Sequence, residues 1–482
     1  MASFSFSHNV LSKGINHKNV ATAQEVKTSQ SVPQALEEPV RSPDLEEWFQ
    51  QEAKKRLATL PQGCLGKQRQ DLLEKPNRYA DGSMAPISLN ELLQMTDLCG
   101  SADDILNRAQ QGVELLRTND SYPEYGTAAR GVPGGGASSR AAKWTRLHPE
   151  LAKRFGLTET LPRPLFRVGS KTLLQHTLDM SQSIARNLGK VFPNVIMTNS
   201  ENVSLFLDVI RKEWGNYTPS ELDATVLFNQ IVLPRMWVDD ETLIQNKLYP
   251  AGHGDYPYLF GKYHFAKALQ ECGIHYLVFS NADEWLWQAD PVMISIAREL
   301  FDQGHHMVII GTKNTNNQFG GGFVRQKDGT QSLVETPRLP WDVVEKGTAP
   351  VALNTTFYMI DVDYLAAHER ALIDVEKSLV VKEVPGRQDG AVEQILGVDS
   401  WAGDVFAACL NPAFIEWPRL NFLGIKDGGF ISGEEPKEEL GGRTYLHYVN
   451  ETVNAYPVIM KRLIEGDKNM ASFLADSGYS YF

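Results

Sequence analysis

The sequence predicts an α/β protein whose core is a mixed, mostly parallel sheet. Short apolar runs alternate with helical segments between about residues 170 and 310, a pattern typical of strands joined by crossover helices. The chain has 482 residues, of which 42% are hydrophobic and 22% charged, so it can bury a sizeable core in about two or three domains.

Four regions are expected in order. Residues 1–42 are polar with little periodicity and predict a disordered or targeting tail. Residues 43–120 predict a helical N-terminal segment that begins at Pro43, after a candidate N-cap and before acidic residues. Residues 121–430 predict the α/β domain, and residues 431–482 a small C-terminal region.

Within the α/β domain the hydrophobic pattern places the elements one by one. Apolar residues at helical spacing predict helices, whereas short runs of four or five apolar residues predict buried strands. The predicted helices cover residues 171–188, 203–214, 261–272 and 291–303, and the predicted strands cover residues 194–198, 224–228, 276–279 and 306–310.

Charge and cysteine usage narrow the functional class. The formal net charge of −12 argues against a nucleic-acid partner, because phosphate backbones attract basic surfaces. The four cysteines are far apart and form no Cys-x-x-Cys pair, which favours a reducing compartment over a disulfide framework or structural zinc. No apolar run approaches the ~20 residues that span a bilayer. A cytoplasmic protein is therefore expected, with an N-terminal targeting or secretion segment as the alternative.

A glycine loop opens the α/β domain. Gly134, Gly135 and Gly136 let backbone N–H groups approach an anion without interference from a Cβ atom, and Ser138 and Arg140 follow with a hydroxyl and a positive charge. The Gly-Lys-Ser/Thr ending of a Walker A loop is missing. Taken alone, the run is more often an ordinary surface loop.

Three further motifs carry polar chemistry. Arg163 stands between two prolines, which fix the backbone and would present its guanidinium to phosphate oxygens. In residues 249–255, Tyr-Pro-Ala-Gly-His-Gly-Asp, two glycines flank His253 and permit close approach to a flat ligand. Asp283 follows the apolar run 276–279, where a carboxylate at a strand end suggests either a ligand site or a helix N-cap.

In this order the motifs resemble those of the UDP-glucose pyrophosphorylase family, the UTP:sugar-1-phosphate uridylyltransferases, over roughly residues 125–430. The family's Tyr-Pro-Pro-Gly-His-Gly-Asp motif is similar to residues 249–255, and its Phe-Asn-Gln to residues 228–230. Its Asn-Thr-Asn segment resembles the run that begins at Asn354, and its Arg-x-Phe-x-Pro-Val-Lys segment resembles residues 419–426.

The resemblance implies a Rossmann-like nucleotidyltransferase core in residues 121–430, with UTP and a sugar 1-phosphate, most readily glucose 1-phosphate, as substrates and Mg²⁺ as cofactor. A sugar-phosphate oxygen would attack the α-phosphorus of UTP, and pyrophosphate would leave in line. The implied residues are Arg163, Lys426 and Arg140 for catalysis, Gly134, Gly135, Gly136, Ala137, Ser138, Gln230, Gly252 and His253 for the nucleotide, Asn281, Glu335 and Asn354 for the sugar, and Asp283 for the metal.

Several positions depart from the family pattern. Arg163 replaces a lysine, Ala137 replaces the usual glycine, and Glu284 replaces asparagine after Asp283. Residues 144–160 are an insertion. An inactive nucleotide-sugar-binding protein of the same fold is therefore the alternative to an active enzyme. A glycosyltransferase with a metal-binding Asp-x-Asp is the third and weaker reading, because its nearest candidates, Asp361-Val362-Asp363 and Asp283-Glu284, are poorly placed for that role. The sequence leaves the oligomeric state open.

Overall fold

The computed structural model describes the sheet and most of its flanking elements. It covers residues 34–35, 43–58, 85–86, 128–136, 139–168, 170–187, 191–213, 217–218, 221–222, 224–244, 248–283, 291–314, 321–325, 331–335, 352–375, 377–385, 387, 392–417, 428–432, 436–437, 442–444, 447–448 and 451. Among the helices in these ranges, none is long and apolar enough to cross a membrane.

An eight-stranded sheet forms the centre of the described structure. Its spatial order is β1 (Gln34–Ala35), β7 (Thr225–Asn229), β6 (Asn194–Thr198), β3 (Ala128–Pro133), β11 (Tyr276–Phe279), β15 (Ala352–Asp361), β12 (Met307–Lys313) and β18 (Pro412–Trp417). Every neighbouring pair is parallel except the two that involve β15, which runs antiparallel to both β11 and β12. The predicted mixed, mostly parallel α/β sheet is confirmed.

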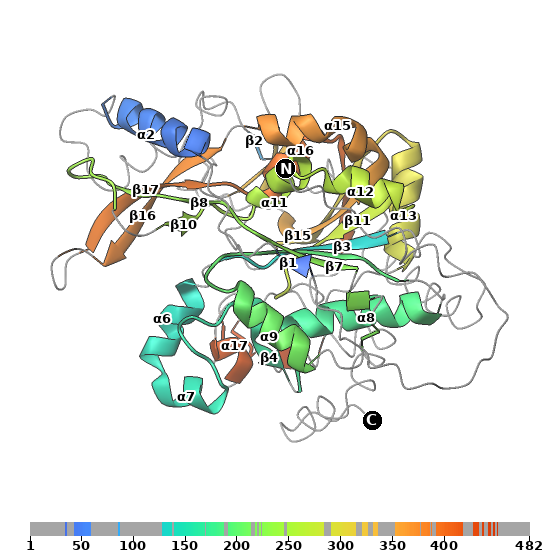
Figure 1. Cartoon of the computed structure of the whole chain (residues 1–482), viewed down its shortest axis with the longest axis horizontal. Helices are drawn as coiled ribbons and strands as arrows, with labels where there is room; N and C mark the ends of the chain where they lie inside the picture. The colour runs from blue at the N-terminus through green and yellow to red at the C-terminus, as the bar shows by residue number, and fades with distance from the viewer. Residues whose placement is uncertain are drawn as a thin grey trace.

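Helices cover both faces of this sheet (Figure 1). One layer contains α11 (Asp255–Lys262), α12 (Phe265–Glu271), α13 (Pro291–Asp302), α15 (Val362–Asp374) and α16 (Ala402–Cys409). The opposite layer contains α8 (Leu173–Asn187) and α9 (Val203–Glu213), with α6 (Ser139–Leu147), α7 (Pro149–Arg154) and α17 (Gly428–Ser432) beside them. The predicted insertion thus contributes the second half of α6, from residue 144, and all of α7.

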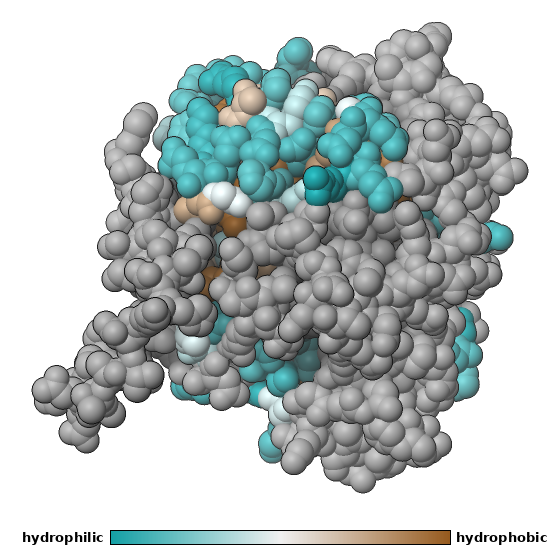
Figure 2. Space-filling model, turned by 90° about the vertical axis from the view of Figure 1, so that its right-hand side faces the viewer, coloured by the Kyte–Doolittle hydropathy of each residue, from teal (hydrophilic) through white to brown (hydrophobic). Residues whose placement is uncertain are grey.

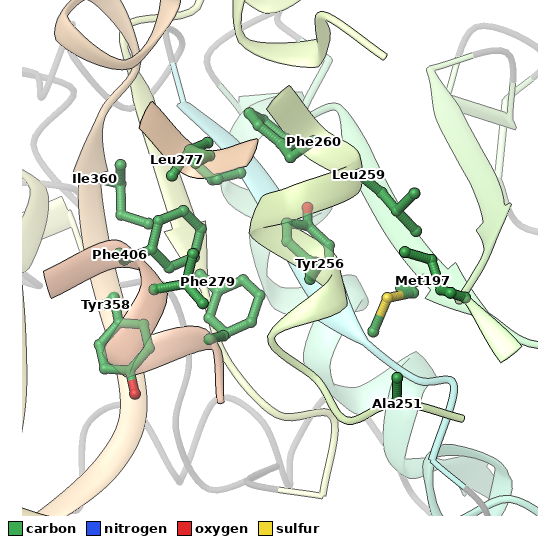
Figure 3. Close-up of a cluster of buried hydrophobic side chains, with 14 of the residues drawn as sticks. Met197, Ala251, Tyr256, Leu259, Phe260, Leu277, Phe279, Tyr358, Ile360 and Phe406 are labelled. Atoms are coloured by element: carbon green, nitrogen blue, oxygen red, sulfur yellow. The ribbon is translucent and has the colours of Figure 1, made fainter. Parts of the chain in front are cut away.

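The hydrophobic core has two clusters, one on each face of the sheet, and side chains along each strand point alternately into one and the other. In β6, Val195 and Met197 belong to the cluster under α11 and α16, whereas Ile196 belongs to the cluster under α8 and α9. Side chains of successive strand residues point to opposite faces, so every residue of a strand covered on both sides is buried, as in β6. Figure 3 shows part of the first cluster, where Tyr256 and Phe279 lie between the helices and the sheet.

Tyr256 links α11 to the sheet by packing and by one hydrogen bond. It is fully buried, its ring lies 4.8 Å from that of Phe279, and its hydroxyl donates to the Val195 carbonyl at 3.1 Å. Replacing Tyr256 with phenylalanine should keep the packing of the ring but remove the hydrogen bond to the Val195 carbonyl. We expect the free energy of unfolding to fall by about 1 kcal/mol, measured by urea denaturation. An unchanged urea midpoint would show that this hydrogen bond contributes nothing to stability.

The described residues also form smaller sheets besides the eight-stranded one. Three strands, β9 (Met236–Trp237), β17 (Val392–Asp399) and β16 (Ser378–Pro385), form an antiparallel arm that extends to one side, with α2 (Pro43–Ala58) beside it (Figure 1). The remaining pairings join β14 (Gln331–Val334), β13 (Gly322–Arg325) and β2 (Ala85–Pro86); β10 (Tyr249–Pro250) and β8 (Val232–Leu233); and β4 (Arg167–Val168) and β5 (Lys171–Thr172).

Charged groups hold the tip of the arm to β9. Arg387 forms ion pairs with Asp239 and Asp240, both at 2.5 Å, and with Glu393 at 3.0 Å, and its guanidinium lies 4.6 Å from the Trp237 ring centre. Hydrogen bonds from Thr242 and then from Arg387 lower the pKa of Asp240 to about 2. These pairs are exposed, so they fix local geometry more than they stabilise the fold.

The described surface away from the sheet is largely polar. Figure 2 shows mostly hydrophilic side chains among the described residues of one face. Among all described residues, only Leu147 and Val392 are large hydrophobic side chains that are exposed.

The element predictions can be compared residue by residue. The strands expected at 194–198 and 276–279 have those bounds, and the helix expected from Pro43 begins there. The helix expected at 261–272 is wrong in one respect: the chain forms α11 and α12, separated at His264, whose φ of 58° is left-handed. The His264 ring is 2.7 Å from the buried Glu369 carboxylate, a contact from α15 that holds the break.

Candidate active site

The glycine loop leaves the carboxyl end of β3 and crosses the ends of β6 and β7. Gly134 donates its N–H to the Met197 carbonyl at 2.7 Å. A Cβ atom on Gly135 would lie 2.7 Å from the Thr198 carbonyl oxygen and 2.5 Å from Gln230 Oε1, so the loop approaches its neighbours too closely for any side chain there. At Gly136 a Cβ atom would meet nothing within 4 Å. The loop therefore lies against the sheet edge at one end and faces open space at the other.

The second loop, residues 249–255, lies beside the first and is joined to it through Gln230. Gln230 Nε2 donates to the Gly252 carbonyl at 2.6 Å. Gly252 has φ of +92°, and a Cβ atom there would lie 2.1 Å from Asp399 Oδ1 and 2.4 Å from the Ser400 carbonyl oxygen. Glycine is required at this position on both counts.

Residues after β17 hold the other side of this second loop. Gly254 donates its N–H to the Ser400 carbonyl at 2.9 Å, and Ser400 Oγ donates to the Ala251 carbonyl at 3.2 Å. The Ala402 N–H donates to His253 Nδ1 at 3.1 Å, which places the ring at the start of α16 and requires the tautomer protonated at Nε2 when the ring is neutral. His253 thus has a structural contact in addition to its predicted role at the nucleotide.

Burial modifies the ionisation of two groups behind this loop. Arg235 stacks on Tyr249, with 3.9 Å from its guanidinium carbon to the ring centre, and burial lowers its pKa. Asp255, the last residue of the motif, is fully buried and forms an ion pair with Lys377 at 2.7 Å. Burial raises the pKa of Asp255, and the positive charge of Lys377 opposes that rise.

Arg163 and Asp283 meet at the end of β11. Arg163 opens the short 3₁₀ helix η3 (Arg163–Leu165), and its Nη1 donates to Asp283 Oδ2 at 2.5 Å. The Asp283 side chain is only 5% exposed and that of Arg163 is 32% exposed. The segment after β11 is fixed by the Ser280 N–H, which donates to the Gly131 carbonyl at 3.1 Å. The predicted phosphate-binding cation and the predicted metal ligand are therefore direct neighbours.

Glu335 and Asn354 form a third group at the start of β15. Asn354 Nδ2 lies 3.3 Å from Glu335 Oε1 and 2.8 Å from the Tyr358 hydroxyl. Burial raises the pKa of Tyr358 well above its usual value, and the charge of Glu335 adds to the rise. Because β15 is antiparallel to β11, with Tyr358 opposite Phe279, this start of β15 lies at the same edge as Asn281 and Asp283.

The candidate residues are thus spread along one edge of the sheet. That edge comprises the carboxyl ends of β7, β6, β3 and β11 and the amino end of β15, in this order. Ligands of open α/β sheets bind at the carboxyl ends of their parallel strands. Ala137, Ser138 and Lys426 lie outside the described residues, as does the side chain of Arg140, whose backbone belongs to the first turn of α6.

The Asp-x-Asp candidate lies at the opposite edge. Asp361 pairs with Tyr276 across β15 and β11, accepts the Tyr364 N–H at 3.0 Å as the N-cap of α15, and lies 3.0 Å from His306. Asp363 lies 2.7 Å from His275. Both carboxylates have local partners far along the strands from the glycine loop, which removes the argument for a glycosyltransferase metal site at this pair.

Three contributors to the loops were not expected from the sequence. Lys377 and Ser400 lie about 120 and 150 residues along the chain from the groups they contact, and no local motif marks either residue. The four-residue spacing of Tyr358 from Asn354 indicates only that both residues lie in one strand, and it does not predict the contact between them. Asp255 gave an indirect indication of Lys377, because a buried carboxylate requires a buried partner.

The fold is that of a nucleotidyltransferase-like α/β protein, and one edge of its sheet brings together glycine turns, a Gln amide and an Arg–Asp pair as the candidate site. The sequence profile of the family described as UTP–glucose-1-phosphate uridylyltransferase matches residues 150–426, more than half of the chain. The chain belongs to this family, and the predicted resemblance is confirmed.

Solved structures agree on the fold. UDP-glucose pyrophosphorylase from Leishmania major is 16% identical, with a TM-score of 0.53 and coverage of 82% of this chain and 79% of that chain. UDP-N-acetylglucosamine pyrophosphorylase from Trypanosoma brucei, solved with an inhibitor, is also 16% identical, with a TM-score of 0.51 and coverage of 79% and 72%. A comparison with curated proteins gives no significant match.

Proposed function

We propose that this protein is a UTP:sugar-1-phosphate uridylyltransferase that forms a UDP-sugar and pyrophosphate, with glucose 1-phosphate as the first candidate substrate. The observation that carries the proposal is the order of the candidate groups along the sheet edge. Gln230 follows β7, the glycine loop follows β3, Asp283 with Arg163 follows β11, and Asn354 opens β15. Four strand spacings separate the ends of this row, or about 19 Å. A UDP-sugar has the same linear order of base, phosphates and sugar.

The base would occupy the end of the row at Gln230. This side chain is 1% exposed, its Nε2 is used by Gly252, and its Oε1 is buried without a hydrogen-bond partner beside Gly135. A buried acceptor without a partner is destabilising unless a ligand supplies a donor. The N3–H of uracil would supply one, whereas the N3 of cytosine is itself an acceptor.

The phosphates would lie between the glycine loop and Arg163. Backbone N–H groups of the loop and the guanidinium would stabilise charge that develops on the phosphate oxygens as the sugar phosphate attacks the α-phosphorus and pyrophosphate leaves. The displacement needs no covalent intermediate, so catalysis would consist of holding both substrates in line. Lys426, from outside the described residues, is proposed as a second cation for the same charge.

A magnesium ion would fit at Asp283. Mg²⁺ typically takes one or two carboxylates together with phosphate oxygens and waters, so one buried carboxylate beside a phosphate site suits it. Within the described residues no group of three His, Cys, Asp or Glu side chains could hold a metal alone, and the substrate phosphates would complete the coordination. When bound, Mg²⁺ would neutralise part of the phosphate charge.

One observation favours a second candidate, a nucleotide-sugar-binding protein without turnover. Arg163 replaces a lysine and forms a 2.5 Å contact with Asp283, so the cation and the metal ligand satisfy one another. Arginine is not an equivalent of lysine at a site with defined geometry. If the pair remained closed with UTP bound, binding would persist while catalysis would be lost.

A pyrophosphate-release assay separates the two candidates. The full-length protein is mixed with UTP, Mg²⁺ and, in turn, glucose 1-phosphate, N-acetylglucosamine 1-phosphate and galactose 1-phosphate. We expect pyrophosphate with at least one sugar and the highest kcat/KM with glucose 1-phosphate. UTP binding by calorimetry without turnover on any sugar would establish the binding protein, and the absence of UTP binding would reject both.

A further inference from the structure

A buried tyrosine lies behind the candidate sugar site. Tyr358, in β15, is fully buried, and its ring stacks on that of Phe279 with 5.7 Å between the ring centres. Figure 3 shows its hydroxyl pointing away from the other labelled side chains of the cluster. A Cβ atom on Gly403, in the first turn of α16, would lie 2.3 Å from the hydroxyl oxygen. Tyr358 is therefore covered, and any effect that it has on a ligand must pass through a neighbouring side chain.

The amide of Asn354 is that neighbour. Its Nδ2 lies 2.8 Å from the Tyr358 hydroxyl oxygen and 3.3 Å from Glu335 Oε1. Its Oδ1 accepts the Thr356 N–H at 3.0 Å and lies 3.1 Å from the Tyr358 hydroxyl. Because a backbone donor fixes the amide oxygen, the NH₂ group is the end that faces the carboxylate. Direct contacts thus join the buried hydroxyl to the amide and the amide to Glu335.

The backbone around this amide is strained. The register of β15 with β12 shifts at this point and leaves Thr355 and Thr356 in a bulge, where Thr356 has φ of 59°. A β-branched residue rarely adopts a left-handed backbone, and such strain persists only where the surrounding structure enforces it. The bulge directs the Thr356 N–H to Asn354 Oδ1. The strained backbone therefore serves to fix the direction of the amide.

Glu335 is the member of this network that a ligand could contact. It follows β14 and is only partly buried. Its Oε1 would lie 2.6 Å from a Cβ atom on Gly321, whose carbonyl accepts the Asn354 N–H at 2.8 Å. The carboxylate is thus held between the Gly321 backbone and the Asn354 amide. A carboxylate has about four acceptor sites, so one that accepts from an amide can also accept from a sugar hydroxyl.

We propose that Tyr358 is a positioning residue: it fixes the Asn354 amide, and the amide holds Glu335 as an oriented acceptor for one hydroxyl of the sugar. The proposal rests on the proposed function, because it assumes that the sugar lies at this end of the site. An acceptor that is oriented before binding loses less freedom when the sugar arrives. The network therefore sets how strongly one hydroxyl is recognised, while the nucleotide end of the site at Gln230 is unaffected.

Steady-state kinetics of Tyr358→Phe tests this role, because the variant keeps the ring and removes only the hydroxyl. We expect the KM for glucose 1-phosphate to rise about tenfold, since the released amide no longer orients Glu335, and the KM for UTP to stay unchanged. Tyr256→Phe is the matched control. It removes the hydroxyl of another fully buried tyrosine of the core and should leave the KM for the sugar phosphate unchanged.

A series of deoxyglucose 1-phosphates, each lacking one ring hydroxyl, separates positioning from general support of the fold. We expect one member to be a poor substrate for the wild type, and Tyr358→Phe to lower its kcat/KM no further. Changes that act through the same contact are not additive. An equal loss with every sugar of the series, or the same loss in the Tyr256→Phe control, would overturn the proposal.

The remaining outcomes also have a definite meaning. If Tyr358→Phe does not fold, Thr356→Gly takes its place, because it releases the strained backbone that directs the amide and is expected to raise the same KM. A folded variant whose KM for the sugar phosphate equals that of the wild type would reject the positioning role alone. A wild type that turns over no sugar 1-phosphate would reject the proposed function as well.

Discussion

Replacing Gly252 with alanine is expected to weaken UTP binding by about 10²-fold and to destabilise the fold, because a side chain at this position has no room. Its Cβ would lie 2.1 Å from Asp399 Oδ1 and 2.4 Å from the Ser400 carbonyl oxygen. The backbone cannot relax independently, since Gln230 holds the Gly252 carbonyl at 2.6 Å. Displacing the loop would shift the Gln230 amide with it, and binding would fall together with stability.

Gly304 provides a matched control for this substitution. It has φ of +88°, close to the +92° of Gly252, but a Cβ atom on it would meet nothing within 4 Å. Gly304→Ala should therefore show the left-handed backbone penalty alone, about 1–2 kcal/mol. Gly252→Ala should add about 1–3 kcal/mol for the overpacking. Equal urea midpoints for the two variants would contradict the close contact at Gly252.

Asp283→Asn is expected to reduce kcat/KM by about 10²–10³-fold while leaving the protein folded. The substitution keeps the size of the side chain but removes the charge that pairs with Arg163 at 2.5 Å and that would hold Mg²⁺. A neutral amide is a poor magnesium ligand beside phosphates, so the Mg²⁺ concentration that gives half of the maximal rate should rise. The pyrophosphate-release assay across a magnesium series measures both effects.

The exposed pair on α15 controls for the loss of a carboxylate in general. Asp374 pairs with Arg370 at 3.0 Å, and both side chains are largely exposed. Asp374→Asn should leave kcat/KM and the thermal midpoint unchanged within error, because surface pairs contribute little. Full activity of Asp283→Asn at low magnesium would remove Asp283 from the mechanism and with it the proposed metal site.

The strands of the core could be predicted closely because burial on both faces leaves a clear pattern. The runs 194–198 and 276–279 have apolar centres of three or four residues, and the structure places strands at those bounds. The break at His264 could not be predicted, since its left-handed backbone depends on Glu369, a residue about 100 positions away. Local pattern carries no information about such partners.

The residues of the candidate site also differ in how far the sequence could predict them. Gly135 and Gly252 were predicted to let a ligand approach the backbone. The structure shows instead that protein atoms leave no room for a side chain at either position, and the ligand contact stays a prediction. The contact between Arg163 and Asp283 joins residues 120 positions apart, and nothing in either motif indicates it. Sequence could identify the kinds of groups at the edge of the sheet, but their pairing depends on the topology that brings β3, β11 and β15 together.

The hydrogen bonds that Ser400 and Ala402 make to the 249–255 loop have a consequence for synthesis of the chain. The loop contacts residues that follow it by about 150 positions. Ribosomes add about 5–20 residues per second, so roughly 7–30 s pass between emergence of the loop and emergence of Ser400 and Ala402. During that interval the 249–255 loop lacks these hydrogen bonds, so the loop cannot complete its folded contacts until residue 402 has been synthesised.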